Sequence, residues 1–133
     1  MRILIMGLPG SGKSTLAAKL EEELSPDCLW LNADTIREQY NDWDFSEEGR
    51  IRQSIRMREL ADASNKKYVI ADFVCPLPIM RKNYAADYTV WMDTIRTGRY
   101  EDTNKIFEPP EYYNIHITEQ YAEKYAAEIA RKL

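Results

Sequence analysis

Three glycines, a lysine and a serine near the start of the chain have the spacing of a phosphate-binding loop. Gly7 is followed after four residues by Gly12-Lys13-Ser14, the pattern glycine, four residues, glycine, lysine, serine or threonine. Glycines allow successive backbone N–H groups to turn inward, and the helix that follows adds its positive end. Lys13 can reach the β- and γ-phosphates of ATP, and the Ser14 hydroxyl can ligate Mg²⁺. The predicted ATP-binding residues are Gly7, Pro9, Gly10, Ser11, Gly12, Lys13, Ser14 and Thr15.

Two aspartates are candidates for Mg²⁺ and proton chemistry, because each follows a short apolar run that reads as a strand. Strand ends are where α/β sheets place functional groups. Asp34 could orient Mg²⁺ or accept a proton from an attacking hydroxyl, and Asp34 or Thr35 could also cap a helix beginning near Ile36. Asp72 has the position of the second Mg²⁺-organising carboxylate of phosphate-loop enzymes. The predicted catalytic residues are Lys13, Asp34 and Asp72, and the predicted metal ligands are Ser14, Asp34 and Asp72.

A parallel sheet must bring these residues together, and apolar runs alternate with helical patterns in the way that builds one. This alternation predicts an α/β fold of the three-layer P-loop NTPase type, with about five parallel strands and helices on both faces. Strands are expected at 3–6, 28–31, 68–71, 87–93 and 114–117. Helices are expected at 16–24, from 36, at 47–64 with Ser46 as cap, at 79–84, and from 118 to 133. The polar stretch 94–110 predicts either a lid or a disordered surface loop.

Length and composition favour a single cytoplasmic domain spanning residues 1–133. The net charge of −4 argues against a protein that coats nucleic acid, although arginines between 50 and 58 allow a local basic site. Cys28 and Cys75 lack metal spacing and are expected to be buried or half-buried thiols in a reducing compartment. The sequence has neither an apolar run of the ~20 residues that a membrane helix needs nor a signal-peptide pattern.

Several segments, in their order and spacing, resemble the adenylylsulfate kinase family, whose members phosphorylate the 3′-hydroxyl of adenosine 5′-phosphosulfate. The loop 7–15 is close to the family loop, and Leu31-Asn32-Ala33-Asp34-Thr35-Ile36-Arg37 is similar to a leucine-aspartate-glycine-aspartate-asparagine-valine-arginine segment of the family. The match falls at Asp34 and Arg37. Further similarities lie at Asn41, Phe45-Ser46, Arg50, Ile55-Arg56, Phe73-Val74-Cys75-Pro76, Arg81, Phe107-Glu108-Pro109-Pro110-Glu111 and Asn114-Ile115-His116-Ile117.

The resemblance implies an ATP- and Mg²⁺-dependent kinase with a small-molecule nucleotide as its acceptor. Asp34 would organise the substrate hydroxyl or the metal, while Arg37 and Arg50 would hold the phosphosulfate group, which suits arginine forks. Phe73 would stack on the adenine. Asn41, Phe45 and Arg81 would line the same pocket, and the resemblance to a family that often dimerises allows a homodimer.

The sequence departs from the family pattern at three places. Cys75 replaces a serine, Asn32 replaces the first aspartate, and the long family lid is reduced to 94–106, where Arg96, Arg99 and Lys105 could partly substitute. Because lids exclude water and complete a site, the short lid predicts slower transfer, leakage of ATP to hydrolysis, or a different acceptor. The alternatives are a kinase for another nucleotide or a nucleic-acid hydroxyl, disfavoured by the acidic charge, and a nucleotide-binding module without transfer activity.

Overall fold

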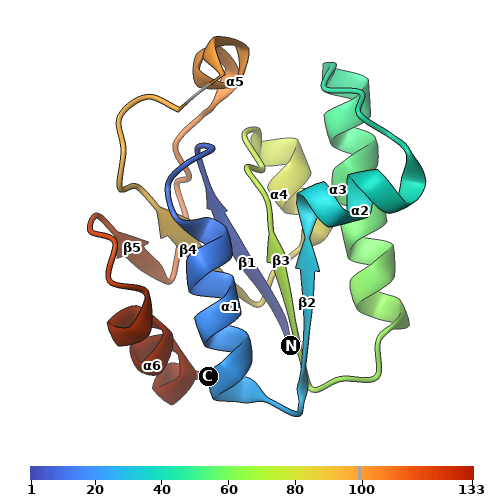
Figure 1. Ribbon diagram of the computed structural model, residues 1–133. Coiled ribbons are helices and arrows are strands. Elements are labelled where there is room, and N and C mark those ends of the chain that lie inside the picture. Colours follow the sequence, from blue (N-terminus) through green and yellow to red (C-terminus); the bar gives the residue numbers. More distant parts are fainter. Residues whose placement is uncertain (99) are drawn as a thin grey trace.

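A parallel sheet in the order β2-β3-β1-β4-β5 forms the centre of the computed structural model, which describes residues 1–98 and 100–133 (Figure 1). The predicted α/β fold with about five parallel strands is therefore confirmed. The strands are β1 (Arg2–Gly7), β2 (Cys28–Asn32), β3 (Tyr68–Asp72), β4 (Tyr88–Met92) and β5 (Ile115–Ile117). The helices are α1 (Lys13–Leu24), α2 (Ala33–Tyr40), α3 (Glu47–Ala63), α4 (Pro78–Tyr84), α5 (Glu101–Ile106) and α6 (Ala122–Lys132).

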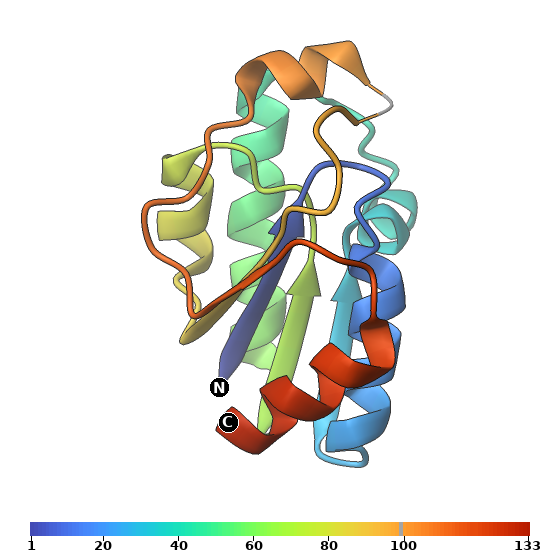
Figure 2. The same cartoon turned by 90° about the vertical axis from the view of Figure 1, so that its left-hand side faces the viewer.

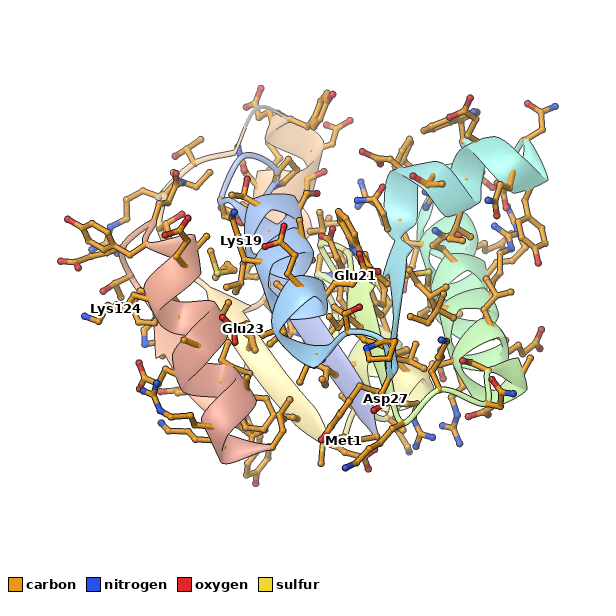
Figure 3. The ribbon with its side chains drawn as sticks, turned by 60° about the horizontal axis from the view of Figure 1, so that its bottom comes forward. Met1, Lys19, Glu21, Glu23, Asp27 and Lys124 are labelled. Atoms are coloured by element: carbon orange, nitrogen blue, oxygen red, sulfur yellow. The ribbon has the colours of Figure 1, made fainter. Side chains whose placement is uncertain are left out.

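Helices cover both faces of the sheet, which explains why β1 is apolar at successive positions. Ile3 and Ile5 pack into a core with α1 and α6, while Leu4 and Met6 pack into a second core with α2, α3 and α4. Strands buried on both faces lose the alternation of apolar and polar residues. Figure 3 shows α1 and α6 side by side, with Lys19 labelled on α1, and the Lys19 ammonium lies 3.6 Å from the Glu123 carboxylate of α6.

The carboxyl ends of the strands meet at the edge of the sheet where the phosphate loop begins. In the ladders, Asp72 of β3 lies opposite both Asn32 of β2 and Ile5 of β1. β1 ends at Gly7, whose φ of 153° brings its Cα against the Met92 carbonyl of β4 so closely that a Cβ would overlap that oxygen. Only glycine fits this end of the strand, and the chain can then turn over the sheet edge into α1.

Two expected helix starts are wrong. Helix α2 begins at Ala33, and its cap is Asn32, whose Oδ1 accepts a hydrogen bond from the Thr35 backbone N–H, so neither Asp34 nor Thr35 caps it. Helix α6 begins at Ala122 instead of 118. The segment before it runs along the phosphate loop, where the Gln120 side-chain amide donates to the Ser11 carbonyl over 3.2 Å, so tertiary contact with the loop holds this segment. The Ser46 cap of α3 is confirmed, since its hydroxyl accepts from the Gly49 N–H.

The stretch 94–110 contains a helix that the sequence pattern does not predict. Helix α5 lies across the end of the molecule that carries the phosphate loop (Figure 2). Among the lid cations named above, Arg99 lies outside the described residues. Cys75 is buried and Cys28 is half-buried, as expected. Within the described ranges, no helix has the length and apolar character needed to cross a membrane.

Candidate active site

The phosphate loop joins β1 to α1 and is held by contacts with the chain that surrounds it. Gly10 and Gly12 have φ angles of 90° and 96°, a left-handed conformation that favours glycine. The Ser11 carbonyl accepts hydrogen bonds from the Thr94 hydroxyl at 2.6 Å and from the Gln120 amide. The Lys13 ammonium donates to the Leu8 carbonyl over 3.1 Å, so this side chain lies against the loop whose phosphates it is predicted to bind.

A buried carboxylate lies beside the first turn of α1. Asp72 is 2% exposed, and burial raises its pKa, an effect that the nearby Lys13 charge and three hydrogen bonds oppose. Its Oδ2 atom accepts from Ser14 Oγ at 3.0 Å, Asn32 Nδ2 at 2.9 Å and Trp30 Nε1 at 3.3 Å. The fold therefore brings together Ser14 and Asp72, two of the three predicted metal ligands.

The chemistry of this pair fits Mg²⁺, which prefers oxygen ligands and is usually held by one or two carboxylates together with substrate phosphates. Ser14 supplies a hydroxyl oxygen and Asp72 a carboxylate oxygen next to the phosphate loop. In the described part of the chain no three His, Cys, Asp or Glu side chains gather into a metal cluster. Asp34 is exposed in the first turn of α2, and no hydrogen bond among described residues joins it to Ser14 or Asp72.

A cleft of about 820 Å³ extends from the phosphate loop to the space beneath α5. It is large enough for a nucleotide and a second small molecule, since ligand pockets typically measure about 300–1,000 Å³. The predicted site residues that line it are Pro9, Gly10, Gly12, Lys13, Ser14, Thr15, Asp34, Phe45, Arg50, Asp72 and Phe73. Gly7 lies beneath the loop, and Ser11 is fully buried within it.

Phe45 forms an aromatic platform in the lining of the cleft. Its ring is half-exposed, with the Arg37 guanidinium 4.2 Å and the Arg50 guanidinium 5.4 Å from the ring centre. Arg50 Nε also donates to the Phe45 carbonyl over 2.8 Å, which fixes the backbone at this point. Phe73 is buried, packs edge-on against Tyr84 at 6.0 Å, and also borders the cleft.

Three predicted substrate-binding residues do not line the cleft. Arg37 is 4% exposed, and its Nη1 donates to the carbonyls of Asp42 and Asp44 at 2.9 and 3.1 Å. Arg81 donates to the carbonyls of Cys75, Pro76 and Glu108, so it joins the loop after β3 to the end of the lid. Asn41 has a left-handed conformation and ends α2. Their roles in substrate binding remain predictions, and the observed contacts of Arg37 and Arg81 are with the protein's own backbone.

The shortened lid is connected to both halves of the cleft. Its Asn104 side chain makes two hydrogen bonds with the Gly98 backbone, at 2.8 and 3.1 Å. Gly98 packs so closely on Pro9 of the phosphate loop that an added Cβ would lie 3.1 Å from the proline ring. On the opposite side, Arg50 Nη2 donates to the buried Thr103 hydroxyl over 3.1 Å. These contacts connect α5 to the phosphate loop and to α3, and the role of this segment as a lid stays a prediction.

A family model described as Adenylylsulphate kinase matches residues 1–97. The chain belongs to the adenylylsulfate kinase family. The part of this adenylylsulfate kinase homologue that lies outside the match, 98–133, includes α5 and everything after it. The match therefore covers the region that carries the phosphate loop, Asp34 and Asp72, and ends before α5.

Comparison with solved structures supports the same fold. The Mycobacterium tuberculosis APS kinase CysC in complex with AMPPNP and APS gives a TM-score of 0.82 at 20% identity, covering 98% of this chain and 95% of that one. A Cys556Ala mutant of the same kinase gives 0.77 at 24% identity, with 98% and 94% covered. Shikimate kinase from Acinetobacter baumannii in complex with shikimate gives 0.67 at 19% identity, with 98% and 91% covered. A search of curated proteins found no match.

The positions of several site residues depend on the fold and do not follow from local sequence patterns. Asn32 could have been found, since it pairs with the predicted Asp72 if β2 and β3 are neighbours. Trp30 follows from the same reasoning, because side chains two apart on a strand share a face. No local pattern identifies the residues that approach from the lid and from the segment before α6. The missed residues that border the cleft are Asn32, Trp43, Tyr100, Asp102, Thr103 and Gln120.

Proposed function

We propose that this protein is an Mg²⁺-dependent kinase that transfers the γ-phosphoryl group of ATP to the 3′-hydroxyl of adenosine 5′-phosphosulfate. The observation that carries the proposal is the single cleft that contains both the phosphate loop and the Phe45 platform beside Arg50. A donor and an acceptor bound there would lie side by side under one lid. Such positioning, together with charge stabilisation, accounts for most of the catalysis in phosphoryl transfer.

In the proposed reaction, the acceptor hydroxyl oxygen forms a bond to the γ-phosphorus while the bond from that phosphorus to the bridging oxygen breaks and ADP leaves. Asp34, exposed at the cleft, accepts the hydroxyl proton directly or through water. Lys13 and the loop N–H groups neutralise charge on the phosphates. Ser14 and Asp72 would hold Mg²⁺, which would offset negative charge on the phosphates when bound.

On the acceptor side, Phe45 and Phe73 offer aromatic surfaces to a purine, and Arg50 offers a guanidinium to its anionic group. Burial lowers the pKa of Arg50, and the charge of Asp102, which also borders the cleft, opposes this shift. Among the described residues, Arg50 donates hydrogen bonds to a carbonyl and a hydroxyl, so a bound anion would add a charged partner for its guanidinium. We therefore expect Arg50 to bind the phosphosulfate group and Phe73 or Phe45 to stack on the base.

A second candidate, a kinase for another small-molecule hydroxyl, is favoured by the position of Arg37. Only one of the two arginines expected to hold phosphosulfate borders the cleft, because Arg37 is engaged beneath Phe45. An acceptor with less negative charge needs fewer guanidinium groups. The two candidates differ in the acceptor and share the donor site, the metal ligands and the chemistry.

The test is label transfer from [γ-³²P]ATP to a panel of acceptors that includes adenosine 5′-phosphosulfate, nucleosides, other small alcohols and DNA. The proposal predicts label on the 3′-position of adenosine 5′-phosphosulfate, and none when Lys13 is replaced by alanine. Label on a different small molecule would favour the second candidate. Label on no acceptor, with ATP bound tightly, would refute both kinase proposals.

A further inference from the structure

Two side chains of β2 hold the Asp72 carboxylate through hydrogen bonds that the phosphate-loop pattern does not predict. Trp30 and Asn32 are two positions apart on β2, so their side chains lie on the same face of the sheet. Asn32 lies opposite Asp72 in the β2–β3 ladder. The Trp30 indole N–H and the Asn32 amide therefore both reach Asp72 Oδ2, at 3.3 and 2.9 Å.

The contacts of Asn32 determine which way its side-chain amide faces. Its Oδ1 accepts from the backbone N–H of Thr35 at 3.1 Å and lies 3.2 Å from the Thr35 hydroxyl. The amide nitrogen consequently points at Asp72 Oδ2 and at Ser14 Oγ, which is 3.2 Å away. An amide turned the other way would place donor against donor at Thr35 and acceptor against acceptor at Asp72.

An aspartate at position 32 would conflict with Asp72. It would bring a second carboxylate oxygen to the place of the Asn32 nitrogen, 2.9 Å from Asp72 Oδ2, and two like charges at that distance cannot both ionise without a large cost. Asparagine keeps the oxygen that caps α2 and replaces the other oxygen by a donor. Asparagine at position 32 therefore avoids the repulsion that a second carboxylate would create beside Asp72.

We propose that Trp30 and Asn32 are positioning residues of the Mg²⁺–nucleotide site, which fix the Asp72 carboxylate and the Ser14 hydroxyl in the arrangement that receives the ion. The Trp30 indole N–H can only donate a hydrogen bond, so it keeps the Asp72 Oδ2 atom turned toward the ring. The Trp30 ring packs against the core between the sheet and α1, which fixes the donor in place. This inference rests on the proposed Mg²⁺–ATP site and is independent of the identity of the acceptor.

Side-chain indole NMR signals test the inference without any acceptor. The chain has three tryptophans, so the ¹⁵N-labelled protein gives an indole N–H signal for each of Trp30, Trp43 and Trp91. Addition of Mg²⁺ to the protein saturated with a non-hydrolysable ATP analogue should shift the Trp30 signal. Trp91, whose ring stacks on His116 at 4.1 Å on the other face of the sheet, should not respond. Assignment by Trp43→Phe and Trp91→Phe does not require the Trp30 variant to fold.

The affinity for Mg²⁺ supplies the second readout. Trp30→Phe keeps an aromatic ring and removes the donor, and loss of an outer-shell partner of this kind typically weakens metal affinity about tenfold or more. We therefore expect about tenfold weaker Mg²⁺ binding to the analogue-bound protein, with unchanged affinity for the analogue in EDTA. The matched variant Trp91→Phe should leave both affinities unchanged.

A stationary Trp30 signal on Mg²⁺ addition, or unchanged Mg²⁺ affinity in Trp30→Phe, would overturn the inference. A general loss of analogue binding in EDTA by a folded Trp30→Phe protein would also overturn it, because it would indicate a structural role only. A wild-type protein that shows the predicted Mg²⁺ responses and transfers no phosphoryl group would support the inference and refute the proposed function.

Discussion

Replacement of Thr103 by valine should loosen the lid helix α5 while leaving its shape almost unchanged. Thr103 is 4% exposed, and its hydroxyl accepts the hydrogen bond from Arg50 Nη2 at 3.1 Å. Valine has the same branching and a similar helix propensity, so the main loss is the acceptor. Hydrogen bonds to charged groups contribute about 1.5–3 kcal/mol. Water can partly replace the Arg50–Thr103 hydrogen bond because Arg50 is only half-buried. We therefore expect the substitution to destabilise the closed position of α5 by about 1 kcal/mol.

Amide hydrogen exchange of α5 measures this loss directly. A cost of about 1 kcal/mol corresponds to a roughly fivefold increase in the population of the open lid, and so to roughly fivefold faster exchange of the α5 amides. Amides of α1 should exchange as in the wild type. Thr103→Ser keeps the hydroxyl and should remain close to the wild type, and so should Lys105→Ala, which removes only an exposed ion pair with Glu101. Equal exchange in the valine and serine variants would refute a lid held by Arg50.

Three further substitutions test other parts of the account. Lys13→Ala should lower transfer at least 100-fold, as removal of a transition-state contact does, with an unchanged circular dichroism spectrum; unchanged turnover would contradict the role of the loop. Arg37→Ala should lower the free energy of unfolding, measured in urea, by about 2–3 kcal/mol, because two carbonyls lose a buried charged donor. Arg52 is a half-exposed arginine of the same region, and Arg52→Ala should have a much smaller effect. Similar losses in the two variants would argue against a structural role for Arg37. Gly7→Ala should cost about 3 kcal/mol through strain and overlap with the Met92 carbonyl, and near-wild-type stability would contradict that contact.

The sheet and the phosphate loop could be predicted because both depend on local patterns. β1 is a continuous apolar run that ends at a glycine, and the loop motif follows it at once. The same locality predicted the Ser46 cap, since a serine followed by acids is a helix start in many surroundings. Asp72 was predicted for a related reason: it ends a buried strand, and strand ends of parallel sheets converge.

The position of the arginines could not be predicted, because their partners are set by turns that form only in the fold. Arg37 bonds to carbonyl oxygens of the turn after α2, and every residue type has such oxygens. Arg52 and Arg56 belong to the arginines between 50 and 58 that allow a local basic site, and both bond to the protein's own Asp42. Their guanidinium groups hold the pKa of that carboxyl well below its usual range. The sequence shows that an arginine is present, but it does not show whether the guanidinium binds an anionic ligand or a carboxylate of the protein itself.

The acceptor side of the cleft depends on chain segments that are distant in the sequence. Arg50 of α3 and Thr103 of α5 are 53 positions apart and meet in one hydrogen bond. Helix α5 itself is six residues long, too short for an apolar period to reveal it. Its stability comes from its contacts with Arg50 and, through Asn104, with Gly98. The lid was therefore visible in the sequence only as a polar interval.

The central claim is that one cleft binds ATP and a hydroxyl-bearing nucleotide and transfers the phosphoryl group between them. The most direct test is a single-turnover reaction of wild-type protein with [γ-³²P]ATP, Mg²⁺ and adenosine 5′-phosphosulfate, alongside the Lys13→Ala variant. In the wild type, label should move to the 3′-position of the acceptor faster than it is released as inorganic phosphate, and the variant should show no transfer. Label that stays on ATP or appears only as inorganic phosphate in the wild type would contradict phosphoryl transfer to this acceptor.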